Sequence, residues 1–163
     1  MSPINLEKVF EGDFSSNVPA TPMAAIKIME HYGINLEGKN IAVINRSMVF
    51  GRSFAMMALD RNATPMICHS RTKDLADITK NMDIVVTAQG RAKALGKEYF
   101  NEDSIIVDVG MSLDSDGKLS GDADFDNLED YVSMIPPSPG GVGAMTTSIL
   151  LEQVVNSCDR MNK

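Results

Sequence analysis

NIAVINRSMVFG, residues 40–51, is the stretch that decides the fold of this chain. It begins with a polar residue and four consecutive apolar residues, continues into the polar turn 45–47, and ends on Gly51. A short run that is apolar throughout is typical of a parallel strand that is buried on both faces of its sheet. A polar turn with a glycine, followed by a helix, is the usual continuation of such a strand in a doubly wound fold. The stretch therefore predicts the first strand–turn–helix unit of a parallel sheet.

The same alternation continues along the chain in both directions. A helix is predicted to begin at Thr21-Pro22, with Thr21 as its N-cap, and to stop at Gly33. Strands are predicted at residues 40–45, 64–68, 84–86 and 105–107, and further helices at residues 50–61, 74–80 and from 143 onward. We also expect a hairpin over 111–122, a brief helix capped by Asp124, and a last strand over 131–135. The prediction is an α/β fold: a Rossmann-like, doubly wound, mostly parallel sheet with helices on both faces.

Length and composition fit one globular domain. The chain has 163 residues, of which 44% are hydrophobic and 23% are charged, so it can form a core of its own. Residues 1–20 have few periodic signals, and we expect them to be an irregular lead-in. Residues 21–163 are expected to form the Rossmann-like domain.

Composition also argues against several classes of partner. The net charge of -7 disfavours nucleic acid, because no basic surface is available for a phosphate backbone. No stretch approaches the roughly 20 apolar residues of a membrane span, and no segment resembles a signal peptide. The two cysteines and two histidines have no metal-ligand spacing, so no metal site is expected. We expect a cytoplasmic protein that binds neither nucleic acid nor a membrane.

Two turns that contain glycine are candidates for contact with a small ligand. In the first, Asn45, Ser47 and Gly51 stand where a dinucleotide-binding turn usually has its glycines: Asn tolerates a tight or left-handed backbone, and Gly51 allows close helix packing. The second turn consists of Pro139, Gly140, Gly141, Val142 and Gly143. Its glycines permit a ligand to approach the backbone closely. Each pattern by itself also fits a structural turn that joins a strand to a helix or directs the last helix.

The end of the second predicted strand indicates which dinucleotide would bind. A protein that prefers NAD usually has an acidic residue here for the ribose hydroxyls, but no acid occurs between Asn62 and Thr72. The chain instead has Ser70 and Arg71 here, and Arg46 can reach across from the first turn. Two guanidinium groups and a hydroxyl suit a 2′-phosphate, which predicts NADP rather than NAD. The alternative is that Arg71 and Lys73 are solvated loop charges.

Several motifs taken together are more specific than any one of them. They are Pro19-Ala20-Thr21-Pro22, Arg46-Ser47 with Gly51, Cys68-His69-Ser70-Arg71-Thr72, Asp108-Val109-Gly110, Gly121-Asp122-Ala123-Asp124-Phe125, and Pro139 to Gly143 followed by Met145-Thr146. In this order and spacing, the chain resembles the C-terminal NAD(P)-binding domain of the bifunctional methylenetetrahydrofolate dehydrogenase/methenyltetrahydrofolate cyclohydrolase family. The corresponding family patterns are P-C-T-P, G-R-S-x-x-V-G, C-H-S-[RK]-T, D-V-G, G-D-V-D-F and P-G-G-V-G-P-M-T.

The resemblance implies contacts, an activity and an assembly. Arg46, Ser47 and Ser70 would contact NADP, whereas Asn45 and Met111 would contribute mainly through their backbone. The 139–143 loop would face the folate side of the cleft. The family transfers hydride from methylenetetrahydrofolate to NADP and then hydrolyses the methenyl product, and it tends to form homodimers through this domain.

The chain departs from the family patterns at five motif positions, which carry Ala24, Asn45, Ser53, Pro136 and Ala144. A larger difference is a lobe that the family has and this sequence lacks. In the family, an N-terminal lobe holds the folate and carries the acid–base lysine within Y-x-x-x-K, and no tyrosine here is followed by that spacing.

The sequence therefore predicts the NADP-binding part of such an enzyme, with no catalytic residue of its own and with folate as substrate only if the other lobe is supplied. The alternative is a non-catalytic NADP-binding or partner module of a split or degenerate family member. A third possibility, a related two-lobed dehydrogenase with another substrate, is disfavoured by the C-H-S-R-T and P-G-G-V-G motifs.

Overall fold

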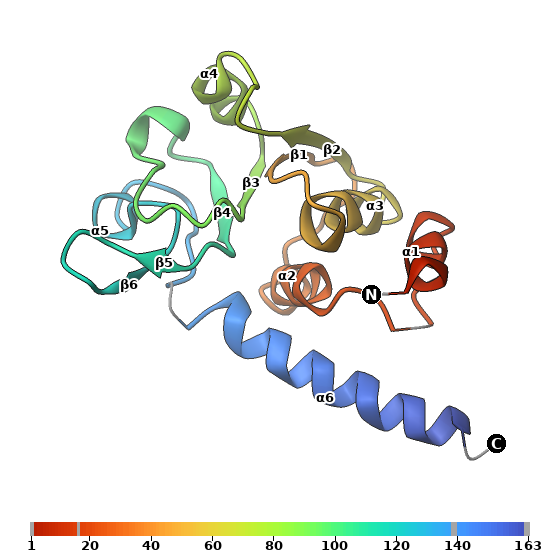
Figure 1. Ribbon diagram of the computed structural model, residues 1–163. Helices are drawn as coiled ribbons and strands as arrows, with labels where there is room; N and C mark the ends of the chain where they lie inside the picture. The colour runs from red at the N-terminus through yellow and green to blue at the C-terminus, as the bar shows by residue number, and fades with distance from the viewer. Residues whose placement is uncertain (1, 16, 138–139, 162–163) are drawn as a thin grey trace.

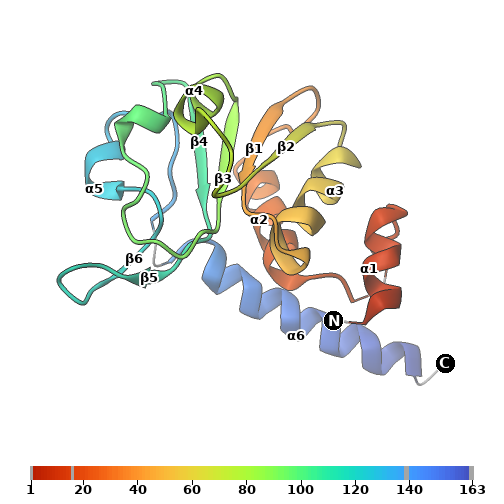
Figure 2. The ribbon, with the colours of Figure 1, turned by 45° about the horizontal axis from the view of Figure 1, so that its top comes forward.

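The central sheet of the computed structural model, which describes residues 2–15, 17–137 and 140–161, has four parallel strands. They are β1 (Asn40–Ile44), β2 (Thr64–Cys68), β3 (Ile84–Thr87) and β4 (Ile105–Asp108), in the spatial order β2-β1-β3-β4. The strands are short and apolar, and β1 and β3 are buried almost throughout. Figures 1 and 2 show helices on both sides of this sheet. The Rossmann-like prediction is confirmed.

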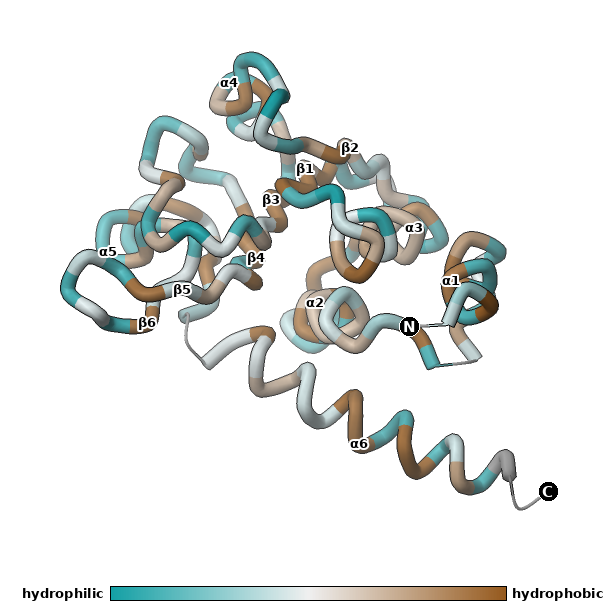
Figure 3. Tube along the Cα trace, in the orientation of Figure 1, coloured by the Kyte–Doolittle hydropathy of each residue, from teal (hydrophilic) through white to brown (hydrophobic). Residues whose placement is uncertain are grey.

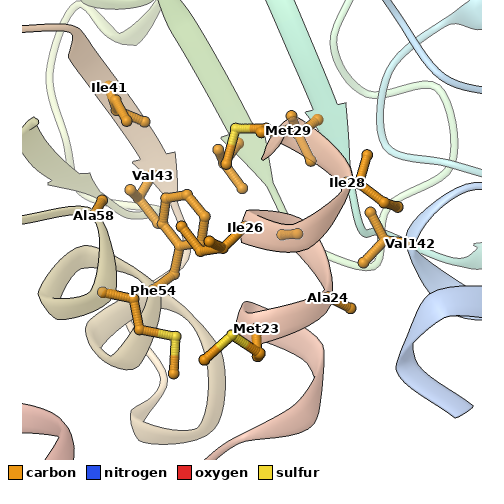
Figure 4. Close-up of a cluster of buried hydrophobic side chains, with 14 of the residues drawn as sticks. Met23, Ala24, Ile26, Ile28, Met29, Ile41, Val43, Phe54, Ala58 and Val142 are labelled. Atoms are coloured by element: carbon orange, nitrogen blue, oxygen red, sulfur yellow. The ribbon is translucent and has the colours of Figure 1, made fainter. Parts of the chain in front are cut away.

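Alternate residues of each strand enter two separate cores. Ile41, Val43 and Val86 face one side, where α2 (Ala20–His31) and α3 (Ser53–Leu59) cover the sheet and α6 (Val142–Met161) packs against α2. Figure 4 shows how Phe54 of α3 and Ile26 of α2 fill the space beneath β1. This period of two is the expected consequence of strand geometry.

The opposite side of the sheet has a smaller core. It is formed by Ala42, Ile44, Val85 and Ile106 together with Phe100. Its cover comes from α4 (Leu75–Lys80), the 3-10 turn η2 (Lys97–Tyr99) and α5 (Phe125–Leu128). A hairpin of β5 (Ser112–Leu113) and β6 (Leu119–Ser120) lies beside it, as the Asp-Ser-Asp-Gly turn predicted.

Several local expectations are corrected. The first twenty residues are not irregular throughout, because α1 (Pro3–Phe10) forms there with Pro3 in its first turn and Val9 buried. Helix α2 begins at Ala20 with Pro19 as N-cap, so Thr21 lies inside the helix and makes no capping bond. The strand expected at 131–135 is reduced to one bridge between Met134 and Ile105, and two prolines follow it.

The helix expected at 50–61 starts earlier and ends earlier. It begins as a π-helical turn, η1 (Met48–Arg52), and continues as α3 to Leu59. The wide turn is held by the Arg52 N–H, which donates to the Ser47 carbonyl at 3.0 Å, and by the Ser53 hydroxyl, which donates to the Met48 carbonyl at 2.6 Å.

Strand β2 is one edge of the sheet. Its first residue, Thr64, directs its N–H toward β1, where it donates to the Lys39 carbonyl at 2.8 Å. Pro65 comes next, so its nitrogen faces away from β1. Proline in a sheet is tolerated at such an edge position because no ladder hydrogen bond is lost.

Helix α6 packs on α2 but remains apolar on its outer side as well. Figures 1 and 2 show it running beneath α2 toward α1, and Figure 3 shows hydrophobic residues recurring along it. Gln153 and Ser157 attach its second half to the lead-in through bonds to the Val18 carbonyl and the Asn17 side chain. The outer face, which we call the α6 stripe, carries Leu150, Leu151, Val154 and Val155, all more than half exposed. Among the described residues, no helix combines the length and apolar character needed to cross a membrane.

Candidate cofactor site

The order in which the chain forms its strands indicates where a ligand site should lie. After β1 the chain passes to β2 on one side and then returns to β3 on the other side of β1. The carboxyl ends of β1 and β3 therefore flank the point where the winding reverses, and ligands of doubly wound sheets bind in the crevice outside that point. Asn45 follows β1, Ala88 follows β3, and Val109 follows β4 at the same edge.

The first turn is organised by the side chain of Asn45. Its Oδ1 accepts from the N–H of Ser47 at 2.8 Å and from the N–H of Gly51 at 3.2 Å, and its Nδ2 donates to the Ala88 carbonyl at 2.6 Å. Asn45 does not have positive φ, so the expected left-handed backbone is not the reason that asparagine fits here. The reason is that its carboxamide bonds both to the turn and to the strand beyond it.

Gly51 allows the helix to pack directly against the end of β1. A Cβ at this position would lie 1.9 Å from the Asn45 carbonyl oxygen, a separation that no side chain can adopt. The Ser47 hydroxyl fixes the same turn by accepting from the Phe50 N–H at 3.2 Å. The close packing that the sequence predicted for Gly51 is confirmed.

The second turn presents Ser70 and Arg71 to solvent. Residues 69–72 form a tight turn in which the Thr72 N–H donates to the His69 carbonyl at 2.8 Å. The Thr72 hydroxyl accepts from the His69 N–H at 2.9 Å, and the His69 ring nitrogen Nδ1 accepts from the Arg71 N–H at 3.2 Å. The side chains of His69 and Thr72 thus hold the shape of the turn, whereas the side chains of Ser70 and Arg71 are exposed.

Arg46 and Arg71 extend from neighbouring strand ends. Ile44 of β1 is directly paired with Cys68 of β2, and paired strands lie about 4.8 Å apart. Arg46 is two residues beyond Ile44, and Arg71 is three residues beyond Cys68. Both arginines are exposed, and in the part of the chain that the structure describes neither takes part in an ion pair. The structure thus places two unpaired cations at adjacent corners of one sheet edge.

Met111 and the glycine loop lie together at the far side of the same edge. A pocket of about 210 Å³ is lined by Met111, Gly140, Gly141, Val142 and Gly143, together with Thr21, Asp108, Val109, Gly110 and Thr146. It joins the end of β4 to the first residues of α6 and of α2. Gly143 is close enough that a Cβ would lie 3.7 Å from the Met111 Cε. Pro139, which was expected to belong to this loop, lies outside the described residues.

Two buried carboxylates support this edge, and sequence reasoning did not assign them to the site. Asp108 accepts from the N–H of Gly110 and from the N–H of Ala123, each at 2.8 Å. Burial raises the pKa of Asp108 to about 6, the nearby Asp122 carboxylate adds to the rise, and these backbone N–H donors oppose it. The signal available in the sequence was the D-V-G and G-D-x-D-F pair, whose members are distant in the chain.

A family comparison interprets this geometry. Residues 19–162 match the sequence profile described as "Tetrahydrofolate dehydrogenase/cyclohydrolase, NAD(P)-binding domain". The chain belongs to the tetrahydrofolate dehydrogenase/cyclohydrolase family. The match covers both glycine-containing turns and the turn that carries Ser70 and Arg71, so the edge described above belongs to the family's NAD(P)-binding domain.

Individual relatives in the tetrahydrofolate dehydrogenase/cyclohydrolase family agree over almost the whole chain. The bifunctional protein FolD of Clostridium botulinum is 54% identical over 160 residues, which are 98% of this chain and 57% of that protein. A crystal structure of the bifunctional 5,10-methylenetetrahydrofolate dehydrogenase/cyclohydrolase from Thermoplasma acidophilum has a TM-score of 0.92 and 41% identity, over 99% of this chain and 57% of that one.

A third relative has its cofactor in place. The Trypanosoma brucei N5,N10-methylenetetrahydrofolate dehydrogenase-cyclohydrolase (FolD), described as complexed with NADP cofactor and inhibitor, has a TM-score of 0.88 and 30% identity. The alignment spans 99% of this chain and 58% of that one. The present chain therefore spans less than two thirds of the length of these relatives.

Proposed function

We propose that residues 21–163 bind NADP at the carboxyl edge of the sheet, with the 2′-phosphate between Arg46 and Arg71. The observation that carries the proposal is the presence of two unpaired arginines at the ends of adjacent strands. An adenosine ribose held at the end of β2 would meet both guanidinium groups and the Ser70 hydroxyl. Guanidinium–phosphate hydrogen bonds are charge-assisted and are among the strongest that side chains form.

The selectivity for NADP over NAD follows from the same residues. A carboxylate in the second turn would favour the two free ribose hydroxyls of NAD and repel a phosphate. The turn from His69 to Thr72 has no carboxylate, and its backbone is fixed by its own hydrogen bonds. The relative from Trypanosoma brucei, which carries NADP, is consistent with this proposal.

The remaining site residues would hold the middle and the nicotinamide end of the cofactor. Ser47 lies at the first turn, where the diphosphate of a dinucleotide is bound in this fold. Met111 and the glycines from Gly140 to Gly143 lie at the far end of the edge, and their open backbone suits the flat nicotinamide. The groups present therefore fit a dinucleotide laid across the strand ends.

A calorimetric titration with NADP and NAD tests the proposal. We expect NADP to bind more tightly than NAD, and we expect Arg71→Ala to weaken NADP by about tenfold or more while NAD changes little. Lys73→Ala is the matched control, since it removes an exposed cation from the same loop beyond the turn. Equal affinity for both cofactors, or tighter NAD, would refute the phosphate assignment.

We further infer that catalysis takes place only with a second lobe. The proposed reaction is hydride transfer from methylenetetrahydrofolate to NADP, followed by hydrolysis of the methenyl product. Hydride transfer requires mainly that the two rings be held face to face, whereas hydrolysis needs a proton-transfer group. The chain lacks the Y-x-x-x-K spacing: the residues four positions after Tyr32, Tyr99 and Tyr131 are Leu36, Asp103 and Ile135.

The α6 stripe is where we place that second lobe. Four apolar side chains lie exposed on the outer face of α6, and a contiguous exposed apolar patch of this kind marks an interaction surface. The test is to assay the chain alone and then with a separately produced lobe of a relative. We expect no cyclohydrolase activity from the chain alone, and a measurable rate from it would disprove this division of roles. We also propose that the protein forms a homodimer and lies in the cytoplasm.

One observation favours a second candidate function, a non-catalytic NADP-binding or partner module. The family pattern has glycine at position 45, but here Asn45 places a side chain at the point where the winding reverses. A binding module tolerates such a change more easily than an enzyme that must hold its cofactor tightly. Restoration of activity by an added lobe would decide for the enzyme, and binding of the lobe without turnover would decide for the module.

A further inference from the structure

The carboxamide of Asn45 bridges the two strand ends between which a dinucleotide would lie. Ala88, its carbonyl partner at 2.6 Å, follows β3, and Asn45 itself follows β1. These are the strands that flank the reversal of the winding. The Asn45 side chain therefore spans the crevice between the carboxyl ends of β1 and β3.

The oxygen of the same carboxamide occupies a position that suits a phosphate oxygen. The N–H groups of Ser47 and Gly51 both point at Asn45 Oδ1, at 2.8 and 3.2 Å. Successive backbone N–H groups that converge on one point form the concave sites in which proteins hold phosphate oxygens. In this chain the acceptor at that point is a neutral oxygen of the chain itself.

Packing around Gly51 fixes the position of its N–H group. Gly51 already abuts the Asn45 carbonyl, and both Phe50 and Gly51 are buried. The Ser47 hydroxyl is occupied by the Phe50 N–H, which fixes the direction of the helix. A ligand oxygen that accepted from both the Ser47 and the Gly51 N–H group would therefore occupy the position where Asn45 Oδ1 now lies.

We propose that Asn45 determines the affinity of the cofactor site, because its carboxamide and the diphosphate of the dinucleotide compete for the N–H groups of Ser47 and Gly51. The inference rests on the proposed binding of NADP. The turn is held closed by its own side chain in the free protein, and binding requires that the carboxamide move aside. Asn45 therefore weakens binding of every ligand with a diphosphate at this position.

The variant Asn45→Gly distinguishes a side chain that competes with the diphosphate from one that only stabilises the turn, because the two roles predict opposite changes in the affinity for NADP. If the side chain only braces the turn, its loss lowers both the stability of the free protein and its affinity for NADP. If the side chain competes, its loss still lowers the stability, because three hydrogen bonds disappear, but it raises the affinity. Opposite signs in these two quantities are a result that a purely structural role does not produce.

The experiment is a calorimetric titration of the wild-type chain, Asn45→Gly and Asn45→Asp with three ligands. NADP and NAD both carry the diphosphate, whereas 2′-AMP carries the adenosine and the 2′-phosphate without it. We expect Asn45→Gly to bind NADP and NAD about tenfold more tightly and 2′-AMP unchanged. The melting temperature of the free protein should fall by about 3 to 6 °C. Asn45→Asp should weaken NADP and NAD, since it sets a negative charge beside the diphosphate.

The outcomes separate this inference from the proposed function. Unchanged or weaker NADP binding by Asn45→Gly, with 2′-AMP unaffected, overturns the competition. Failure of the wild-type chain to bind either NADP or 2′-AMP overturns the proposed function and the inference with it.

A measurement on the wild-type chain avoids dependence on any variant. One of the two Asn45 side-chain amide protons is donated to the Ala88 carbonyl, so NADP should increase its exchange with solvent. Adding 2′-AMP should leave that exchange as it is. Equal exchange with and without NADP would contradict the displacement and show that Asn45 remains in place.

Discussion

The Asp122 carboxylate lies so close to Gly110 that a Cβ at position 110 would be 2.2 Å from the Asp122 Cγ. Asp122 is held there by the Thr87 hydroxyl at 2.8 Å and by the N–H groups of Gln89 and Arg91 at 2.5 and 2.7 Å. One buried carboxylate, on the segment after β6, thus binds the end of β3 and the loop that follows it, and it packs against Gly110 in the loop after β4. The absence of a side chain at Gly110 is what allows this connection.

Replacing Gly110 with alanine should therefore be costly. The added methyl group must displace a buried carboxylate or the backbone that binds it, and we expect a loss of about 3 kcal/mol in the free energy of unfolding. Urea denaturation measures it. Gly143→Ala is the control, because a Cβ there would make an ordinary contact of 3.7 Å with Met111, and its effect should be within about 0.5 kcal/mol. Equal losses in the two variants would contradict the account of Gly110.

The contribution of Asp108 to the free energy of unfolding should fall as the pH rises from about 4 to about 6. Burial raises the pKa of this carboxyl from 3.8 to about 6, so the folded state holds its proton more tightly than the unfolded state does. The favourable contribution is complete below pH 4 and is lost as the pH passes through the folded pKa, a change of about 3 kcal/mol.

The variant Asp108→Asn tests this assignment, because it removes the titration and keeps the size of the side chain. Its free energy of unfolding, measured in urea at half-unit steps of pH, should lack the decline between pH 4 and pH 6. A wild-type curve and a variant curve that run parallel over this window would show that Asp108 does not titrate there.

Arg61 should be more important for stability than its position near the surface suggests. Its Nε donates to Glu30 at 2.9 Å, its Nη1 donates to the Met57 carbonyl at 3.1 Å, and its guanidinium lies 5.8 Å from the centre of the Phe14 ring. It thus connects the lead-in with α2 and α3. We expect Arg61→Ala to lower the free energy of unfolding by about 1 to 2 kcal/mol.

Arg52 provides the comparison for Arg61. It is exposed, and the hydrogen bond found for its side chain is to the sulfur of Met48 at 3.2 Å. Thermal unfolding of Arg52→Ala should show a change below about 0.5 kcal/mol. If the two variants lose the same amount, loss of positive charge is the cause, and the specific contacts of Arg61 are not.

The α6 stripe should make the isolated chain associate with itself at high concentration. Leu151 and Val155 are 64% and 59% exposed, so the double variant Leu151→Glu, Val155→Glu should reduce association without lowering the melting temperature. Analytical ultracentrifugation over a range of concentrations gives the readout. Leu113→Glu is a matched control, since Leu113 is equally exposed at 64% but lies on the hairpin. An equal effect of the control would mean that general charge repulsion, and not the stripe, is responsible.

The sheet could be predicted from the sequence because both of its faces are covered. An apolar run such as Ile41 to Ile44 fits a strand that is buried on both faces better than a strand with one polar face. The predicted bounds of this strand, 40–45, therefore differ from the observed ones by only one residue. The turn at Ser70 and Arg71 could be predicted for a similar reason, since the strand before it ends at the same residue, Cys68, in the prediction and in the structure.

Other features depend on partners that are distant in the chain. The helix α1 is stabilised through one buried residue, Val9, which gives little periodic signal. The role of Asn45 depends on Ala88, which is 43 positions away, and no local pattern shows that the carboxamide reaches it. The candidate site residues were named from motifs and stay a prediction, whereas the contact between Asp108 and Ala123 beside them has no local signal in the sequence.

Pro65 limits how this sheet can be extended. The exposed side of β2 presents a row of backbone groups, and the proline ring removes one donor from the middle of that row. A neighbouring polypeptide that tried to add a fifth strand there would meet a missing hydrogen bond and a bulky ring. Pro65 thus disfavours edge-to-edge pairing of many copies through β2. Contacts between two copies at this edge would have to use helices or side chains.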